Sequence, residues 1–148
     1  MRMTTARRIP IQKYMTQAQH FASPEESVLL AYERMREHDV RHLPVLRDGK
    51  LLGVLFKSDL KLVESLEPAV VRPIKVESLM VTEYYTVGPD EALDVAAREM
   101  SKRKWGSALV TDKGKVVGVF TTTDALRALS DALTDSLPES VMMPDSLR

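Results

Sequence analysis

The sequence predicts an α+β fold built from two copies of one β-α-β-β-α unit. Sliding the 148-residue chain against itself by 65 residues, without a gap, matches identical residues from Ile9 with Ile74 as far as Asp59 with Asp124. A single offset kept over about fifty residues is the signature of a duplicated supersecondary unit. The strand-like runs of each copy are almost continuously apolar, which is typical of strands covered on both faces. A unit this small cannot supply that cover alone, so we expect the two copies to pack on each other.

Each copy opens with a short extended piece that ends at a helix-start signal. The extended pieces are HFA at 20–22 and YTV at 85–87. Ser23-Pro24-Glu25-Glu26 then offers a hydroxyl at N-cap, proline at N1 and glutamate at N3, the capping-box arrangement, and Gly88-Pro89-Asp90-Glu91 is a weaker version. A helix is predicted after each signal, because apolar residues recur there at helical spacing. These residues are Val28, Leu29, Ala31, Tyr32 and Met35 in the first copy, and Leu93, Ala96, Ala97 and Met100 in the second.

Two β-rich runs follow each helix and are joined by a glycine turn, which predicts a hairpin in each copy. The runs are HLPVL (42–46) and LLGVLF (51–56) in the first copy, and SALVT (107–111) and VVGVF (116–120) in the second. A second helix is expected to close each copy, in SDLKLVESL and in TTDALRALSDAL.

The repeat divides the chain into five parts. We expect a flexible basic N-terminus at 1–8, the first repeat at 9–66, a linker at 67–73, the second repeat at 74–133 and a C-terminal tail at 134–148. The tail is either a docking segment or disordered, and its sequence does not decide between the two.

The charges of the chain cancel, with 21 Lys and Arg against 21 Asp and Glu. No long-range field therefore draws the whole molecule onto nucleic acid or an anionic membrane, and neither is expected as a partner. The longest apolar run, 51–56, is too short to span a bilayer, and no apolar signal-peptide region follows the basic N-terminus, so a cytoplasmic location is expected. Cysteine is absent, and His38 and His42 have a metal-ligand spacing without a third ligand, so no metal is expected.

One motif recurs with a difference: GVLFKSD at 53–59 returns as GVFTTTD at 118–124. The glycine and the aspartate keep their spacing, but Phe56 stands where the second copy has Thr121. Each aspartate can cap the exposed N–H groups at the start of the closing helix. A carboxylate can also accept from two neighbouring hydroxyls, and a hydroxyl at a helix start favours an anion, so a ligand site is the alternative to a structural cap.

These residues resemble a tandem pair of cystathionine β-synthase (CBS) domains, the arrangement called a Bateman module. The resemblance covers roughly Ile9 to Leu133 and rests on RHLPVLRDGKLLGVLFKSDL and GSALVTDKGKVVGVFTTTDAL, with YMTQAQHFASPEESV and LMVTEYYTVGPDEAL upstream of them. It implies two repeats packed about a pseudo-twofold axis through their sheets, leaving two clefts that commonly accept AMP, ADP, ATP or S-adenosylmethionine. The sequence does not distinguish among these adenosyl ligands.

In the family motif, G-h-h-[ST]-x-x-D with h apolar, the aspartate binds the ribose hydroxyls and the Ser or Thr donates to a phosphate. The resemblance therefore implies ribose contacts for Asp124 and Asp59, and a phosphate contact for Thr121. Because Phe56 lacks the hydroxyl, one cleft is expected to be weak, selective for uncharged groups, or plugged by the ring. Loss of a hydrogen bond to a charged group costs about 1.5 to 3 kcal/mol.

A basic residue just ahead of the second strand reaches the opposite repeat's ligand in the family. The matching position implies phosphate contacts for Arg41 and His42, with Lys57 as a further candidate, although Arg41 and His42 are equally consistent with a surface pair. The adenine pocket implied by the resemblance is lined by Tyr85, Thr82, Val87 and Ala108.

The resemblance implies a regulatory sensor that binds an adenine nucleotide and passes its occupancy to a separate partner protein, which the sequence does not identify. Family pairs often dimerise through their helices, so a homodimer is expected. A ligand-independent association module is the alternative. Catalysis is not expected, because the chain has no nucleophile elbow, no phosphate loop ending in Lys-Ser/Thr and no carboxylate pair in distinct acid and base environments.

Overall fold

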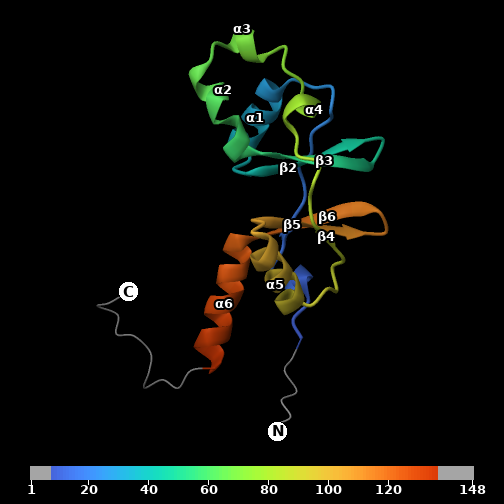
Figure 1. Cartoon of the computed structure of the whole chain (residues 1–148), viewed down its shortest axis with the longest axis vertical. Helices are drawn as coiled ribbons and strands as arrows, with labels where there is room; N and C mark the ends of the chain where they lie inside the picture. The colour runs from blue at the N-terminus through green and yellow to red at the C-terminus, as the bar shows by residue number, and fades with distance from the viewer. Residues whose placement is uncertain (1–7, 137–148) are drawn as a thin grey trace, which may run out of the picture.

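The computed structural model describes residues 8–136, which form two lobes stacked one above the other (Figure 1). Each lobe is a small sheet with helices on its outer side, and the sheets face each other at the middle of the molecule, so the predicted α+β fold is confirmed. The upper lobe contains α1 (Val28–Glu37), β2 (His42–Arg47), β3 (Lys50–Phe56), the 3₁₀ helix η2 (Lys57–Leu60), α2 (Lys61–Ser65), α3 (Pro68–Val71) and α4 (Val76–Leu79). The lower lobe contains the 3₁₀ helix η1 (Ile11–Lys13), β1 (Thr16–Gln17), β4 (Thr86–Val87), α5 (Leu93–Arg103), β5 (Ser107–Asp112), β6 (Lys115–Thr121) and α6 (Thr122–Ser136).

Both hairpins predicted from the sequence are confirmed. β2 pairs with β3, and β5 pairs with β6, each antiparallel with a register shift at the equivalent position. Each hairpin turns through two residues with positive φ, Asp48-Gly49 and Lys113-Gly114. This is the backbone combination of a type I′ turn, whose twist matches that of the flanking strands.

Each lobe also takes in chain from the start of the other repeat. β1 pairs with β6, which joins Thr16 to Val119 and gives the four-stranded sheet the order β1-β6-β5-β4. In the upper lobe, Val81 forms the equivalent antiparallel bridge with Val54. Thr16 and Val81 are themselves 65 residues apart, so the exchange is reciprocal, and each repeat completes the sheet of the other.

The hydrophobic cores are shared in the same way. Ile11 is fully buried in the core of the lower lobe, and its repeat-related residue Val76 is fully buried in the core of the upper lobe. Val71, in the 67–73 stretch expected as a linker, is 1% exposed and belongs to the upper core as well. Val71 therefore anchors this stretch to the upper lobe, while the other residues of 67–73 are exposed.

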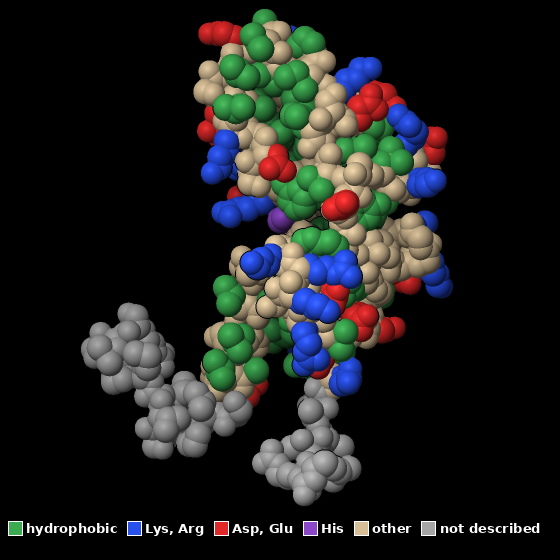
Figure 2. Space-filling model, viewed as in Figure 1, with side chains coloured by type: hydrophobic (Ala, Val, Ile, Leu, Met, Phe, Trp, Pro, Cys, Tyr) green, Lys and Arg blue, Asp and Glu red, His purple; other side chains and the backbone are tan. Residues whose placement is uncertain are grey.

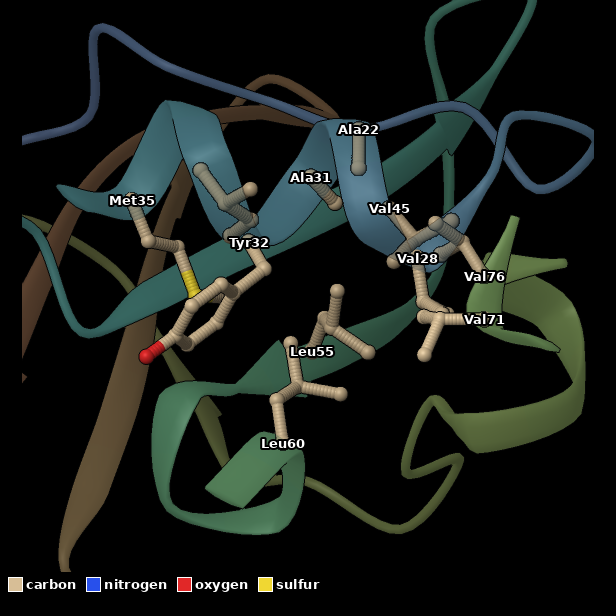
Figure 3. Close-up of a cluster of buried hydrophobic side chains, with 11 residues drawn as sticks. Ala22, Val28, Ala31, Tyr32, Met35, Val45, Leu55, Leu60, Val71 and Val76 are labelled. Atoms are coloured by element: carbon tan, nitrogen blue, oxygen red, sulfur yellow. The ribbon is translucent and has the colours of Figure 1, made fainter. Parts of the chain in front are cut away.

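The apolar stripe predicted on α1 faces the β2–β3 hairpin and α4 (Figure 3). Its buried members are Val28, Ala31, Tyr32 and Met35. A smaller cluster of Val54, Leu109 and Val119 comes from strands of both sheets and packs one lobe on the other.

Both predicted helix starts are wrong by several residues. The sequence predicts an N-cap at Ser23, but α1 is capped by Ser27, whose hydroxyl accepts from the Leu29 amide at 3.1 Å. The reason is tertiary, because Ser27 forms an antiparallel bridge with Lys75 and is held extended. The equivalent bridge between Pro10 and Ala92 delays α5 to Leu93.

The closing helices differ in length. α6 runs for 15 residues and reaches Ser136, past the 133 boundary expected for the second repeat. In the first repeat, the four-residue η2 is followed by the five-residue α2. Residues 1–7 of the predicted N-terminal segment (1–8) and residues 137–148 of the predicted C-terminal tail (134–148) lie outside the described residues.

Candidate functional site

A cleft of about 1250 Å³ opens between the two lobes. Figure 2 shows the hollow there, with a histidine side chain at its edge. Most of the lining comes from four stretches, which are residues 16–20, residues 38–44, residues from 56 to 64 at the end of β3 and in η2 and α2, and residues from 119 to 127 at the β6–α6 junction. Because both repeats contribute, the shape of the cleft depends on how the lobes pack.

Thr121 and Asp124 form a reciprocal cap at the start of α6. The Asp124 Oδ2 atom accepts from the Thr121 amide at 2.9 Å and from the Thr121 hydroxyl at 3.1 Å. The Asp124 amide in turn lies 3.3 Å from Thr121 Oγ1. This is the capping-box geometry, so the structural role considered from the sequence is present. In the first repeat Phe56 occupies the cap position without any side-chain hydrogen bond, which accounts for the weaker helix there.

The Asp124 side chain is also held by Arg127, one helical turn further along α6. Arg127 donates to Asp124 Oδ1 at 3.1 Å and to the Tyr14 carbonyl oxygen at 2.9 Å, and its guanidinium lies 5.9 Å from the centre of the Tyr14 ring. Asp124 is only 3% exposed and is the sole buried charged residue within the described range 8–136. A buried carboxylate is costly unless it is paired, and Arg127 supplies the pairing.

The three predicted phosphate-binding cations, Arg41, His42 and Lys57, all line the cleft together with Thr121 and Asp124. Neither Arg41 nor Lys57 takes part in an ion pair among residues 8–136. Burial lowers the pKa of His42, neighbouring Arg41 lowers it further, and Asp124 acts in the opposite direction. His42 therefore favours the neutral form in the ligand-free protein.

Phe56 lines the same cleft as Thr121. Its ring packs edge-on against His42, its cross-strand partner, with 5.2 Å between the ring centres. Because the two sheets face each other, β3 and β6 lie in contact. The ring thus narrows the cleft from the opposite repeat.

The other predicted ligand residues lie outside this cleft. Asp59 and Thr82 are exposed, and Tyr85 packs on Trp105 with 5.7 Å between ring centres. Val87 and Ala108 are buried in the core of the lower lobe. The structure therefore brings the predicted phosphate residues together with Asp124 in one cleft, but none of the four predicted adenine-pocket residues.

The sequence contained a signal for the residues that do line the cleft. The positions 65 residues before Thr82 and Tyr85 are Gln17 and His20, and both are in the lining. The resemblance implies that the cation and the motif come from opposite repeats, and the same rule applied to the predicted adenine pocket selects residues of the first copy. Arg127 was detectable as well, because a basic residue three positions after an acid pairs with it on a helix.

Two further classes of feature were sought in the part of the chain that the structure describes. Within residues 8–136, no group of three His, Asp or Glu side chains is arranged to hold a metal ion. None of the helices in this range combines the length and the apolar character needed to cross a bilayer.

The family model for the CBS domain matches the chain twice, at residues 11–64 and 76–131. An inosine-5'-monophosphate dehydrogenase of Korarchaeum cryptofilum is 31% identical over 103 residues, which is 69% of this chain and 20% of the enzyme. The chain therefore spans about a fifth of the length of that relative.

Solved structures with this fold include a putative acetoin utilization protein (AcuB) from Vibrio cholerae, with a TM-score of 0.72 and 26% identity over 88% of this chain and 99% of that one. CBSX2, solved in complex with AMP, has a TM-score of 0.67 and 28% identity over 83% of this chain and 97% of its own.

Proposed function

The chain belongs to the CBS-domain family, and we propose that it is a regulatory module that binds an adenosine-containing nucleotide in the cleft between its repeats. Occupancy of the cleft is then passed to a separate partner protein. The observation that most supports this function is the buried carboxylate of Asp124 beside the hydroxyl of Thr121, in a cleft lined by cations. AMP, ADP, ATP and S-adenosylmethionine all carry the adenosine that such a site would recognise.

The hydrogen bonds of Asp124 suit it to a ribose. A carboxylate has about four acceptor positions. Two on Oδ2 are used by Thr121 and one on Oδ1 by Arg127. If the Thr121 hydroxyl turns to a phosphate, one position on Oδ2 becomes free beside the one left on Oδ1. Two neighbouring ribose hydroxyls then have two acceptors, so phosphate and ribose binding reinforce each other.

Similarity to a nucleotide-bound relative also supports an adenine nucleotide. CBSX2 was solved with AMP, and the match between the two structures covers 83% of this chain. Asp59, Tyr85, Thr82, Val87 and Ala108 do not line the described cleft, so the proposed ligand is not assigned to them. Catalysis is not part of the proposal, because the enzyme relative is matched over only a fifth of its length.

A melting panel with adenosine, AMP, ADP, ATP and S-adenosylmethionine tests the proposal. A ligand present at a hundred times its Kd stabilises the fold by about 2.7 kcal/mol, which raises the Tm by roughly 5–10 °C for a chain of this size. Asp124→Asn is expected to abolish the rise, and the matched Asp59→Asn, at the repeat-related position, to leave it intact. An unchanged Tm with every ligand would contradict nucleotide sensing.

Exposed leucines on the closing helices favour a second candidate function, self-association. Leu126 and Leu129 on α6 are 60% and 53% exposed, and Leu62 on α2 is 72% exposed. Figure 2 shows apolar side chains along α6. We propose that these leucines form a homodimer interface. Light scattering is expected to give a dimer for the wild type and a monomer for Leu126→Glu/Leu129→Glu, with Leu30→Glu on α1 as the control. A monomeric wild type would exclude this candidate.

A further inference from the structure

The two repeats line the cleft unequally. For four repeat-related pairs both members line it, and these pairs are Arg41 and Gly106, Phe56 and Thr121, Lys57 and Thr122, and Ser58 and Thr123. Residues 16–20 and 38–40 of the first copy line the cleft as well, whereas their counterparts at 81–85 and 103–105 do not. We call the side lined by 16–20 and 38–40 the open half, and the side that the repeat symmetry places around 81–85 and 103–105 the counterpart half.

Larger aromatic side chains occupy three positions of the counterpart half. They are Tyr84 in place of Gln19, Tyr85 in place of His20, and Trp105 in place of Val40. Tyr84 packs against the cluster of Val54, Leu109 and Val119 that joins the two lobes. The Trp105 ring contacts Tyr85, with 5.7 Å between ring centres, and the Arg103 guanidinium, which lies 5.1 Å from the centre of the Trp105 ring. The three rings are therefore held by contacts with other parts of the protein.

The counterpart half also lacks the polar groups that surround Asp124. Asp124 is 3% exposed and capped by Thr121, whereas Asp59 is exposed and η2 begins without a side-chain cap. The position that corresponds to Arg127 is Leu62. A nucleotide in the counterpart half would therefore find neither a fixed buried carboxylate nor a hydroxyl beside it.

We propose that each chain binds a single nucleotide, in the open half, and that Tyr84, Tyr85 and Trp105 exclude a second nucleotide from the counterpart half. The inference rests on the proposed nucleotide function and adds the stoichiometry of binding and the residues that set it. A second nucleotide would have to displace rings that are already packed, and aromatic side chains dominate the energetics of cores and interfaces. The open half holds no such rings at the same positions, so its space is available to the ligand.

Calorimetric titration of the full chain with AMP counts the ligands bound per chain. The wild type is expected to bind one. The variant Phe56→Thr/Tyr84→Gln/Tyr85→His/Trp105→Val carries at each position the residue of the other repeat, and we expect it to bind a second AMP more weakly than the first. Phe56→Thr alone is the control, because it restores the hydroxyl but keeps the three rings, and it is expected to bind one. Two AMP molecules per chain in the wild type or in the control, or one in the folded four-residue variant, overturns the inference and leaves the proposed function standing.

Trp105 is the only tryptophan of the chain, so its fluorescence reports on the counterpart half without any ligand or substitution. Acrylamide is expected to quench this fluorescence several-fold less than that of free tryptophan. Quenching as strong as that of free tryptophan means that the counterpart half is open and overturns the inference, even where the four-residue variant does not fold. If no adenosine ligand binds to the wild type, the proposed function fails, and the quenching result alone decides whether the counterpart half is closed.

Discussion

Arg127 links Asp124 to Tyr14, a residue from the opposite end of the chain. Its Nη2 atom lies 3.1 Å from Asp124 Oδ1 and 2.9 Å from the Tyr14 carbonyl oxygen. Tyr14 precedes β1, the strand that crosses into the lower sheet. The Asp124 carboxylate, which lines the cleft, is therefore positioned jointly by its own helix and by the crossing segment.

Arg127→Gln is predicted to weaken both the fold and the site. The buried Asp124 carboxylate loses a charged partner, and an unsatisfied buried acceptor costs about 1–3 kcal/mol. Urea unfolding measures the loss, and titration with AMP is expected to give a several-fold higher Kd because the carboxylate is no longer fixed. Arg98→Gln, on the exposed face of α5, is the control and is expected to change neither quantity.

Thr121 is predicted to have two separable roles. Thr121→Val removes the cap of α6 and is expected to cost about 1 kcal/mol of unfolding free energy. It also removes the proposed phosphate donor, so the Kd for AMP rises more than the Kd for adenosine. Thr121→Ser keeps the hydroxyl and preserves both properties. If Thr121→Val raises the Kd for AMP and the Kd for adenosine by the same factor, Thr121 acts only as a helix cap.

The motif glycines are predicted to be required by packing rather than by the ligand. A Cβ at Gly53 would lie 2.7 Å from the Val81 carbonyl oxygen, which is backbone and cannot move aside easily. Gly53→Ala is therefore expected to destabilise the fold by about 1–3 kcal/mol, the usual cost of overpacking. Gly88→Ala is the matched control, because a Cβ there meets nothing within 4 Å. Equal unfolding midpoints in urea for the two variants would contradict this explanation.

The sequence was sufficient to predict what is local and what is repeated. The hairpins follow from β-rich runs joined by glycine turns, and the placement of Thr121 and Asp124 in one cleft with Arg41, His42 and Lys57 follows from the resemblance to the family. It was not sufficient for contacts made between the repeats. β1 has only two residues and no periodicity, so only its pairing with β6 makes it a strand. The delayed start of α1 has the same origin, because the Ser27–Lys75 bridge overrides the capping signal at Ser23.

The turn before α1 is predicted to make the unfolding free energy depend on pH in the acid range. Burial opposes the ionisation of Glu26, but hydrogen bonds from Arg34 and Ser23 outweigh it, so the pKa of Glu26 lies below its ordinary value of 4.5. A lowered carboxyl pKa contributes stability above the unfolded value and loses it as the pH falls through the folded value.

Glu26→Gln is therefore expected to lower the unfolding free energy at pH 7 by about 1 kcal/mol, since Arg34 Nη2 lies 2.8 Å from Glu26 Oε1 and this partly exposed ion pair is lost. As the pH falls below 4.5, the wild type loses the same contribution and the two proteins converge. Urea unfolding at several pH values measures the difference, with Glu33→Gln on the exposed face of α1 as the control. A difference that stays constant down to pH 3 would mean that the Glu26 charge does not stabilise the turn.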